Sequence, residues 1–392
     1  MQARRRTSLW LASVMGLAVL AAVAAFMTTR GKRAEETSAL ATIDEKTPLP
    51  ELSSALRESD ARALAVLFKL TTPAPGTPTP ALTEIDAKQW IDALQGIRTG
   101  FLKLGSYGRA SALTVVGRVL QRFAVEPAPA IWSEILRPAH DLFTAGLADT
   151  NLDVRVTSLM EIGRLWGWYP GRSTIKVEND LLSDWKEAFH AAVVRRLSDR
   201  EPRSRAAAVA CLGYLPIDNA AAPAIAYLED PTSPEVRKQV LVSFAQRPAL
   251  LTEDAVLRHM HDSDPTTTET ARLVLQTRGL TQEQISLGSM IFSPKPAIRA
   301  SVFSFLKERT DLDPIVWLLQ LSRDDDETIR VEAVNMLAAK MTPEVGERLA
   351  EMAATDKSPE VRRAASKFLP ESEKTAALPP LPGSPSLNPK AN

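Results

Sequence analysis

Hydrophobic residues between positions 252 and 369 recur at the three- and four-residue spacing of amphipathic helices, in segments separated by short polar turns. Prolines stand repeatedly at the expected first turns, where their missing N–H has no helical partner to lose. No window shows the period-two alternation of a half-buried strand. The pattern predicts pairs of helices without a sheet, over 252–262 and 266–277, 282–292 and 296–308, 314–322 and 327–340, and 343–355 and 359–369.

One motif recurs at the second helix of these pairs. Its clearest copies are DDDETIRVEAVNMLAAK at 324–340 and DKSPEVRRAASKFL at 356–369, in which an aspartate precedes an arginine by six residues. One such unit cannot bury its own apolar face, whereas several stacked units bury a continuous core. The copies contain Asp149, Asp199, Asp230, Asp324 and Asp356, and Arg155, Arg205, Arg237, Arg299, Arg330 and Arg362, with Arg109 as an earlier candidate.

An aspartate, then Pro-Glu-Val-Arg, then a helix rich in alanine and leucine resembles a HEAT repeat. The resemblance is nearest the short variety in HEAT-like proteins related to phycobilisome lyase subunits, and it covers residues 106–370. It implies an all-α fold, an α-α solenoid over 83–370 with two antiparallel helices per repeat, in which the aspartate and arginine link neighbouring repeats. The chemistry agrees, because an aspartate accepts N–H bonds at a helix start and an arginine can bind a carboxylate with two parallel bonds.

Two positions depart from the motif. The alignment places Ala271 where an arginine is expected, and Ser293 where the aspartate before Arg299 is expected. Neither residue can supply the charge that a rung of the ladder needs. We therefore expect the ladder to be interrupted, with a looser joint between Asp264 and Ser293.

Residues 8–27 form an uncharged apolar run that follows three consecutive arginines. A helix of that length spans ~30 Å at ~1.5 Å per residue, which is the thickness of a bilayer core. We expect one transmembrane helix, a signal anchor over 1–33, with the repeats outside the cytoplasm. The alternative is a signal peptide, cut after the small residues at 22–24, that leaves a secreted or periplasmic protein.

Two further segments flank the expected solenoid. Residues 34–82 have the composition of a tether with one short helix over 51–70 and a proline-rich linker. Residues 371–392 contain five prolines and no apolar periodicity, which predicts a disordered tail.

The composition offers little catalytic chemistry. Lys+Arg and Asp+Glu both number 47, so the chain lacks the net basic charge of a nucleic-acid binder, and we expect no nucleic-acid partner. The single cysteine, Cys211, is expected to be a small buried apolar residue. No Walker loop, nucleophile elbow or Cys/His metal spacing is present. We predict no catalytic residue and no cofactor.

Two polar clusters deserve comparison with metal sites. The segment HMHDSD at 259–264 has two histidines and nearby carboxylates, a combination that suits zinc. It coincides with a helix end, however, where such residues are ordinary. The acidic run 324–327 lacks the ligand spacing of a calcium loop and reads as a helix cap. We therefore predict no metal site at the first cluster, which consists of His259, His261, Asp262 and Asp264.

Three tryptophans, Trp166, Trp168 and Trp185, lie in the longest insertion between motifs. Aromatic residues concentrated in one part of a chain otherwise poor in them suit a partner-binding surface. The alternative is that they fill a wider gap between helices.

Taken together, these patterns predict a non-enzymatic scaffold or adaptor that binds unidentified protein partners at a membrane. The resemblance suggests an alternative, a lyase-type or other enzyme-associated subunit. A structural spacer is the third possibility.

Overall fold

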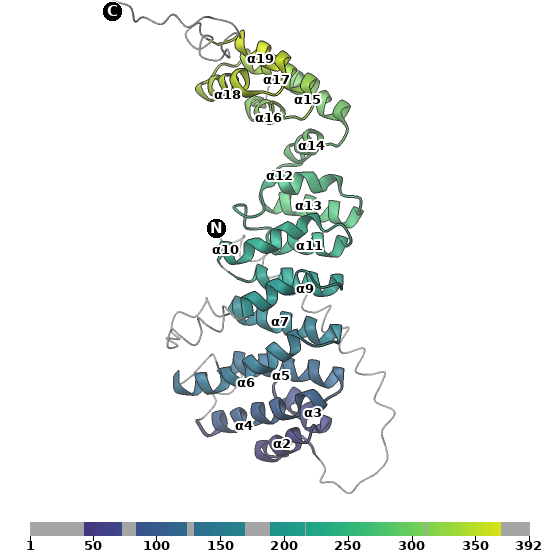
Figure 1. Cartoon of the computed structure of the whole chain (residues 1–392), viewed down its shortest axis with the longest axis vertical. Helices are drawn as coiled ribbons and strands as arrows, with labels where there is room; N and C mark the ends of the chain where they lie inside the picture. The colour runs from purple at the N-terminus through teal and green to yellow at the C-terminus, as the bar shows by residue number, and fades with distance from the viewer. Residues whose placement is uncertain are drawn as a thin grey trace, which may run out of the picture. The chain divides into compact units, whose positions relative to one another are not determined.

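The computed structural model describes residues 43–72, 84–123, 129–168, 189–215, 217–309 and 312–369. All the elements in these residues are helices, and they lie in the compact unit Glu45–Asn392 (Figure 1). The helices of the first half are α2 (Leu49–Arg57), α3 (Ala61–Leu70), α4 (Glu84–Gly100), η1 (Phe101–Lys103), α5 (Ser106–Phe123), α6 (Pro129–Leu147), α7 (Leu152–Trp168) and α9 (Pro202–Gly213).

The second half of the chain contains α10 (Asp218–Ala221), η3 (Ala222–Glu229), α11 (Pro234–Ser243), α12 (Glu253–Arg258), η4 (His259–His261), α13 (Pro265–Thr277), α14 (Gln282–Ile291), α15 (Pro296–Glu308), α16 (Ile315–Leu321), α17 (Glu327–Ala338), α18 (Pro343–Thr355) and α19 (Pro359–Ser366). The predicted helix pairs of this region are confirmed to within a few residues. The exception is 252–262, where the α-helix stops after six residues and continues as the 3₁₀ turn η4.

Short polar side chains fix where these helices begin. Ser233, Thr252, Thr281 and Thr342 each accept a hydrogen bond from a backbone N–H in the first turn, which satisfies a group that has no helical partner. Proline stands in the first turn of α9, α11, α13, α15, α18 and α19, where it costs no hydrogen bond.

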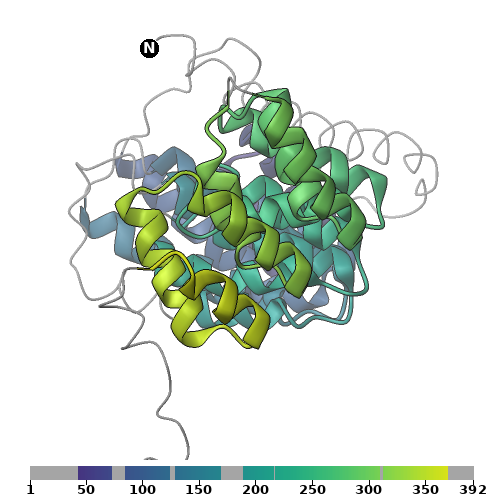
Figure 2. The same cartoon turned by 90° about the horizontal axis from the view of Figure 1, so that it is seen from above.

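The helices pack as two layers of consecutive pairs. In the first layer α2, α4 and α6 are neighbours, followed later by α12, α14, α16 and α18. In the second layer α3, α5, α7, α9, α11 and α13 each pack against the next, and α15, α17 and α19 do the same. Figure 2 shows the last of these helices, α15 to α19, side by side. Apolar residues between the layers form the core.

The region predicted as one short helix over 51–70 is two helices. Ser59, between α2 and α3, has a left-handed backbone with φ of 69°, and Asp60 caps α3 by accepting the N–H of Arg62. Leu52 and Leu67 are fully buried, because α2 packs on α4 and α3 packs on α5. The helical array of the described residues therefore starts at α2.

No helix within the described residues is long and apolar enough to cross a membrane. The predicted transmembrane run 8–27, like the predicted disordered tail 371–392, lies outside them.

Candidate functional site

The most regular polar feature of the described residues is a ladder of arginine–aspartate pairs between successive second-layer helices. In each pair the arginine Nε and Nη2 donate to the two oxygens of one carboxylate. Two parallel charge-assisted bonds fix both distance and orientation. The pairs, with the shortest nitrogen–oxygen distance, are Arg109–Asp149 (2.6 Å), Arg155–Asp199 (2.9 Å), Arg205–Asp230 (2.7 Å), Arg237–Asp262 (2.6 Å), Arg299–Asp324 (2.7 Å) and Arg330–Asp356 (3.0 Å).

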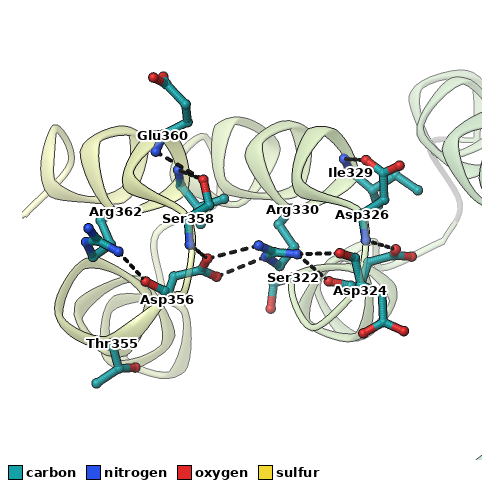
Figure 3. Close-up of polar contacts among 12 residues, drawn as sticks. Ser322, Asp324, Asp326, Ile329, Arg330, Thr355, Asp356, Ser358, Glu360 and Arg362 are labelled. Carbon is teal, nitrogen blue, oxygen red and sulfur yellow. Dashed lines mark hydrogen bonds and ion pairs between the residues drawn. The ribbon is translucent and has the colours of Figure 1, made fainter.

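Each ladder aspartate binds the arginine of the preceding repeat and also makes hydrogen bonds within its own turn. The carboxylate of Asp356 binds Arg330 and also accepts the N–H of Ser358, which leads into α19. The backbone carbonyl of Asp356 accepts from Nη1 of Arg362, the arginine of the same repeat, at 2.6 Å. Figure 3 shows this arrangement, with Arg330 reaching from the carbonyl of Asp324 to the carboxylate of Asp356. One residue thus joins a helix start, its own repeat and the preceding repeat.

The ladder is shielded from water. Arg205 and Asp230 are only 8% and 5% exposed. Burial raises the pKa of the Asp230 carboxyl, but hydrogen bonds from Arg205 and the N–H of Thr232 outweigh burial and leave the pKa below its usual value. The same balance lowers the pKa of Asp149, Asp199, Asp262 and Asp356. These carboxylates are therefore ionised at neutral pH, as the rungs require.

Asp262 is a member of the ladder that the sequence reading missed. Its place beside two histidines suggested only a metal ligand, yet its carboxylate accepts two bonds from Arg237 and the N–H of Asp264. A signal was available, because Asp262 stands three residues before the first residue of α13, as Asp356 does before α19.

The placement of Ala271 at the arginine position was wrong. The ladder arginine is the fourth residue of its helix, as Arg299 is in α15, and the fourth residue of α13 is Thr268. Thr268 lies 31 residues after Arg237 and 31 before Arg299, so the spacing becomes regular. Its hydroxyl donates to the carbonyl of Asp262 at 3.3 Å, as the arginines do in their own turns. The rung is still missing, but the residue that interrupts it is Thr268.

The residues weighed as zinc ligands are engaged separately. The ring nitrogens of His259 contact the carbonyl oxygens of Ala255 and Leu228, both at 2.9 Å, and Nε2 of His261 contacts the carbonyl of Ser289 at 2.7 Å. No group of three or more potential ligands occurs in the part of the chain that the structure describes. In the acidic run, Asp324 binds Arg299 and Asp326 caps α17.

The structure describes the side chain of one of the three tryptophans that were predicted to bind a partner. Trp166 is 4% exposed, and its indole nitrogen has no hydrogen-bond partner among the described residues. Trp185 and the side chain of Trp168 lie outside those residues. A buried Trp166 offers no contact surface itself, so the binding role of this insertion remains a prediction for the other two.

A second buried charge, Glu161 in α7, was not noticed in the sequence. It is 3% exposed, and one oxygen accepts from Arg164 at 2.6 Å while the other has no partner among the described residues. Gly117 leaves room for that oxygen, since a Cβ there would lie 2.3 Å from it. Burial raises the pKa of Glu161 to about 7, against the opposing charges of Arg164 and Arg118. The signal was a glutamate within the apolar run SLMEIGRL.

We expect Glu161→Gln to stabilise the protein at pH 8 and to leave it almost unchanged at pH 4. The pKa of Glu161 in the folded chain is about 7 against its usual value of 4.5, so the folded chain keeps a proton that the unfolded chain releases. Stability therefore falls as pH rises between these values, and glutamine removes a cost of roughly 3 kcal/mol. Urea unfolding at both pH values measures this; the exposed control Glu58→Gln should show no such difference, and equal behaviour of the two variants would contradict it.

Comparison with known proteins adds one family match. Residues 314–382 match the family described as HEAT repeats. No curated protein matches the chain. Among solved structures, similarity is found to a designed armadillo repeat protein (17% identity, 59% of this chain and 99% of that one, TM-score 0.34) and to an engineered protein (15%, 86% and 92%, 0.37).

A third similar structure comes from work on tubulin recruitment by microtubule polymerases with TOG domain arrays. Its identity is 14%, over 82% of this chain and 77% of that one, and its TM-score is 0.36.

The segment 314–382 that matches the HEAT-repeat family includes the rung Arg330–Asp356, and the same geometry recurs upstream in the other rungs. The family match and the repeated ladder together support a HEAT-repeat protein.

Proposed function

We propose that this chain is a non-enzymatic, protein-binding scaffold that presents its repeat array at a membrane, to which residues 8–27 anchor it. One observation carries the binding role. Val242 in α11 and Leu273 in α13 occupy the same place in neighbouring helices, each five residues after the ladder position, and are 46% and 49% exposed. Since α11 packs against α13, the two apolar side chains lie on one face of the second layer.

The buried polar residues described above are not available to a substrate. The ladder residues bind each other, and Glu161, whose pKa suits acid–base work, is buried against α5 rather than presented to a substrate. We therefore propose no catalytic step. A lyase-type enzyme needs an accessible acid or base, and a structural spacer needs no exposed apolar face.

Crosslinking followed by affinity purification from membranes tests the binding role. A photoreactive residue at position 242 or 273 should capture one dominant stoichiometric protein. The double variant Val242→Glu/Leu273→Glu should lower its recovery at least about tenfold, as loss of a central apolar contact does. Val316→Glu is the matched control, since Val316 is 65% exposed on the first-layer helix α16. Equal recovery with all three chains would contradict the proposal.

Membrane anchoring has its own test. The full chain should stay with membranes after alkaline extraction, and a chain lacking 1–33 should be released. Protease added to intact spheroplasts should digest the repeats if they lie outside the cytoplasm, whereas full protection would contradict that orientation.

A further inference from the structure

One second-layer helix, α15, leaves a normally buried position uncovered. Ile298 precedes the ladder arginine Arg299 and is 39% exposed. At the same place in the other second-layer helices from α7 to α19 the side chain is at most 2% exposed, because the preceding second-layer helix covers it. These residues are Val154, Ser204, Val236, Thr267, Ile329 and Val361. In the part of the chain that the structure describes, α13 and α15 hardly touch, so nothing covers Ile298 in this way.

The missing rung lies at the same step. Thr268 occupies the arginine position and Ser293 the aspartate position. Each side chain hydrogen-bonds to the backbone of its own repeat's turn. The Thr268 hydroxyl donates to the carbonyl of Asp262, and the Ser293 hydroxyl accepts the N–H of Lys295. The bidentate bond that holds α11 to α13 and α15 to α17 has no counterpart between these two side chains.

The contacts that cross this step run through first-layer helices. The helix α14 touches both α12 and α13, and Nε2 of Gln320 in α16 donates to Asp254 in α12 at 3.4 Å. A Cβ on Gly288 of α14 would lie 2.7 Å from Leu257 of α12, so the two helices touch closely there. The imidazole of His261 reaches the carbonyl of Ser289, and Arg258 lies over the ring of Phe292, 5.4 Å from its centroid. On the far side, one hydrophobic core runs from Leu287 to Leu369.

We propose that the step between α13 and α15 is a hinge. Its pivot is the contact of α12 with α14, and its free edge is the uncovered face of α15. Such an element, fastened along one layer and open along the other, can rotate by small changes in the connecting residues. Closing it would bury Ile298 against α13 but would form no rung, so no charged pair locks the closed arrangement.

Distances between spin labels at equivalent surface positions test the hinge in the full chain. In α11, α13, α15 and α17 the residue five positions after the ladder site is exposed, and these residues are Val242, Leu273, Ser304 and Asn335. Each is replaced by cysteine in pairs that span successive steps, 242/273, 273/304 and 304/335. Cys211 does not interfere, because it is fully buried and burial raises the pKa of its thiol.

We expect pulsed EPR to give a distance distribution for the pair 273/304 about twice as wide as for the two flanking pairs, which bridge intact rungs. Installing the rung with Thr268→Arg and Ser293→Asp together should narrow the central distribution to the width of the others. Each single substitution is a control that should leave it wide. Equal widths for the three pairs in the natural chain would overturn the hinge, whether or not the double variant folds. If the double variant folds and the 273/304 distribution stays wide, the missing rung is not the cause of the motion.

Discussion

Replacing Asp230 by alanine should destabilise the protein by about 3–5 kcal/mol, because it strands a buried arginine charge. Asp230 accepts from Arg205 at 2.7 and 3.1 Å, and both side chains are almost completely shielded. The same carboxylate accepts the N–H groups of Thr232 and Ser233 at the approach to α11. The substitution therefore removes an inter-repeat link and a local turn at once, and urea unfolding measures the loss.

Two variants separate these effects. Asp230→Asn keeps a hydrogen-bond acceptor for the turn but removes the negative charge, so the remaining loss belongs to the rung. Glu360→Ala is the matched control on the surface, since its pair with Arg363 is well exposed, and its effect should stay within about 0.5 kcal/mol. Losses of similar size for Asp230→Ala and Glu360→Ala would show that the rung contributes no more than a surface pair.

Replacing Gly100 by valine should cost about 3 kcal/mol and detach the first helix pair, because overpacking a close helix contact displaces the backbone. A Cβ on Gly100 would lie 2.2 Å from the carbonyl oxygen of Leu56, at the end of α2. Backbone cannot yield as a flexible side chain does, so α2 has to move away from α4. Hydrogen exchange should show faster exchange over residues 49–70 and little change in α15 to α19.

Gly346→Val is the control for this substitution. Gly346 lies within α18, and the nearest atom to an added Cβ is the terminal methyl of Met341 at 4.0 Å, so valine there should change stability by no more than about 0.5 kcal/mol. If both variants keep protection over 49–70, α2 and α3 do not depend on the contact with Gly100.

The sequence predicted the helices well where local rules agree. For α15 and α18, a first-turn proline and apolar spacing gave the observed limits, Pro296–Glu308 and Pro343–Thr355. The break between α2 and α3 was missed because it depends on the left-handed backbone of Ser59, whose hydroxyl donates to the carbonyl of Gly100. That bond joins residues 41 positions apart, so no local pattern reveals it.

Only part of the arginine–aspartate ladder could be predicted from the sequence motif. Aspartates six residues before an arginine stood out, but Asp262 did not, because its repeat has no arginine to mark the register. Counting from the helix start instead would have placed Thr268 correctly. The exposure of Ile298 could not be predicted, since it depends on the packing of α15 relative to α13 and not on the residues of α15 itself.

The most direct test of the account is a double-mutant cycle on Arg205 and Asp230. Unfolding free energies of the natural chain, Arg205→Ala, Asp230→Ala and the double variant isolate the energy with which the two side chains act together. We predict a favourable coupling of about 2–3 kcal/mol, against less than about 0.5 kcal/mol for the same cycle on Arg363 and Glu360. A coupling indistinguishable from that surface pair would contradict the claim that the arginine–aspartate rungs hold neighbouring repeats together.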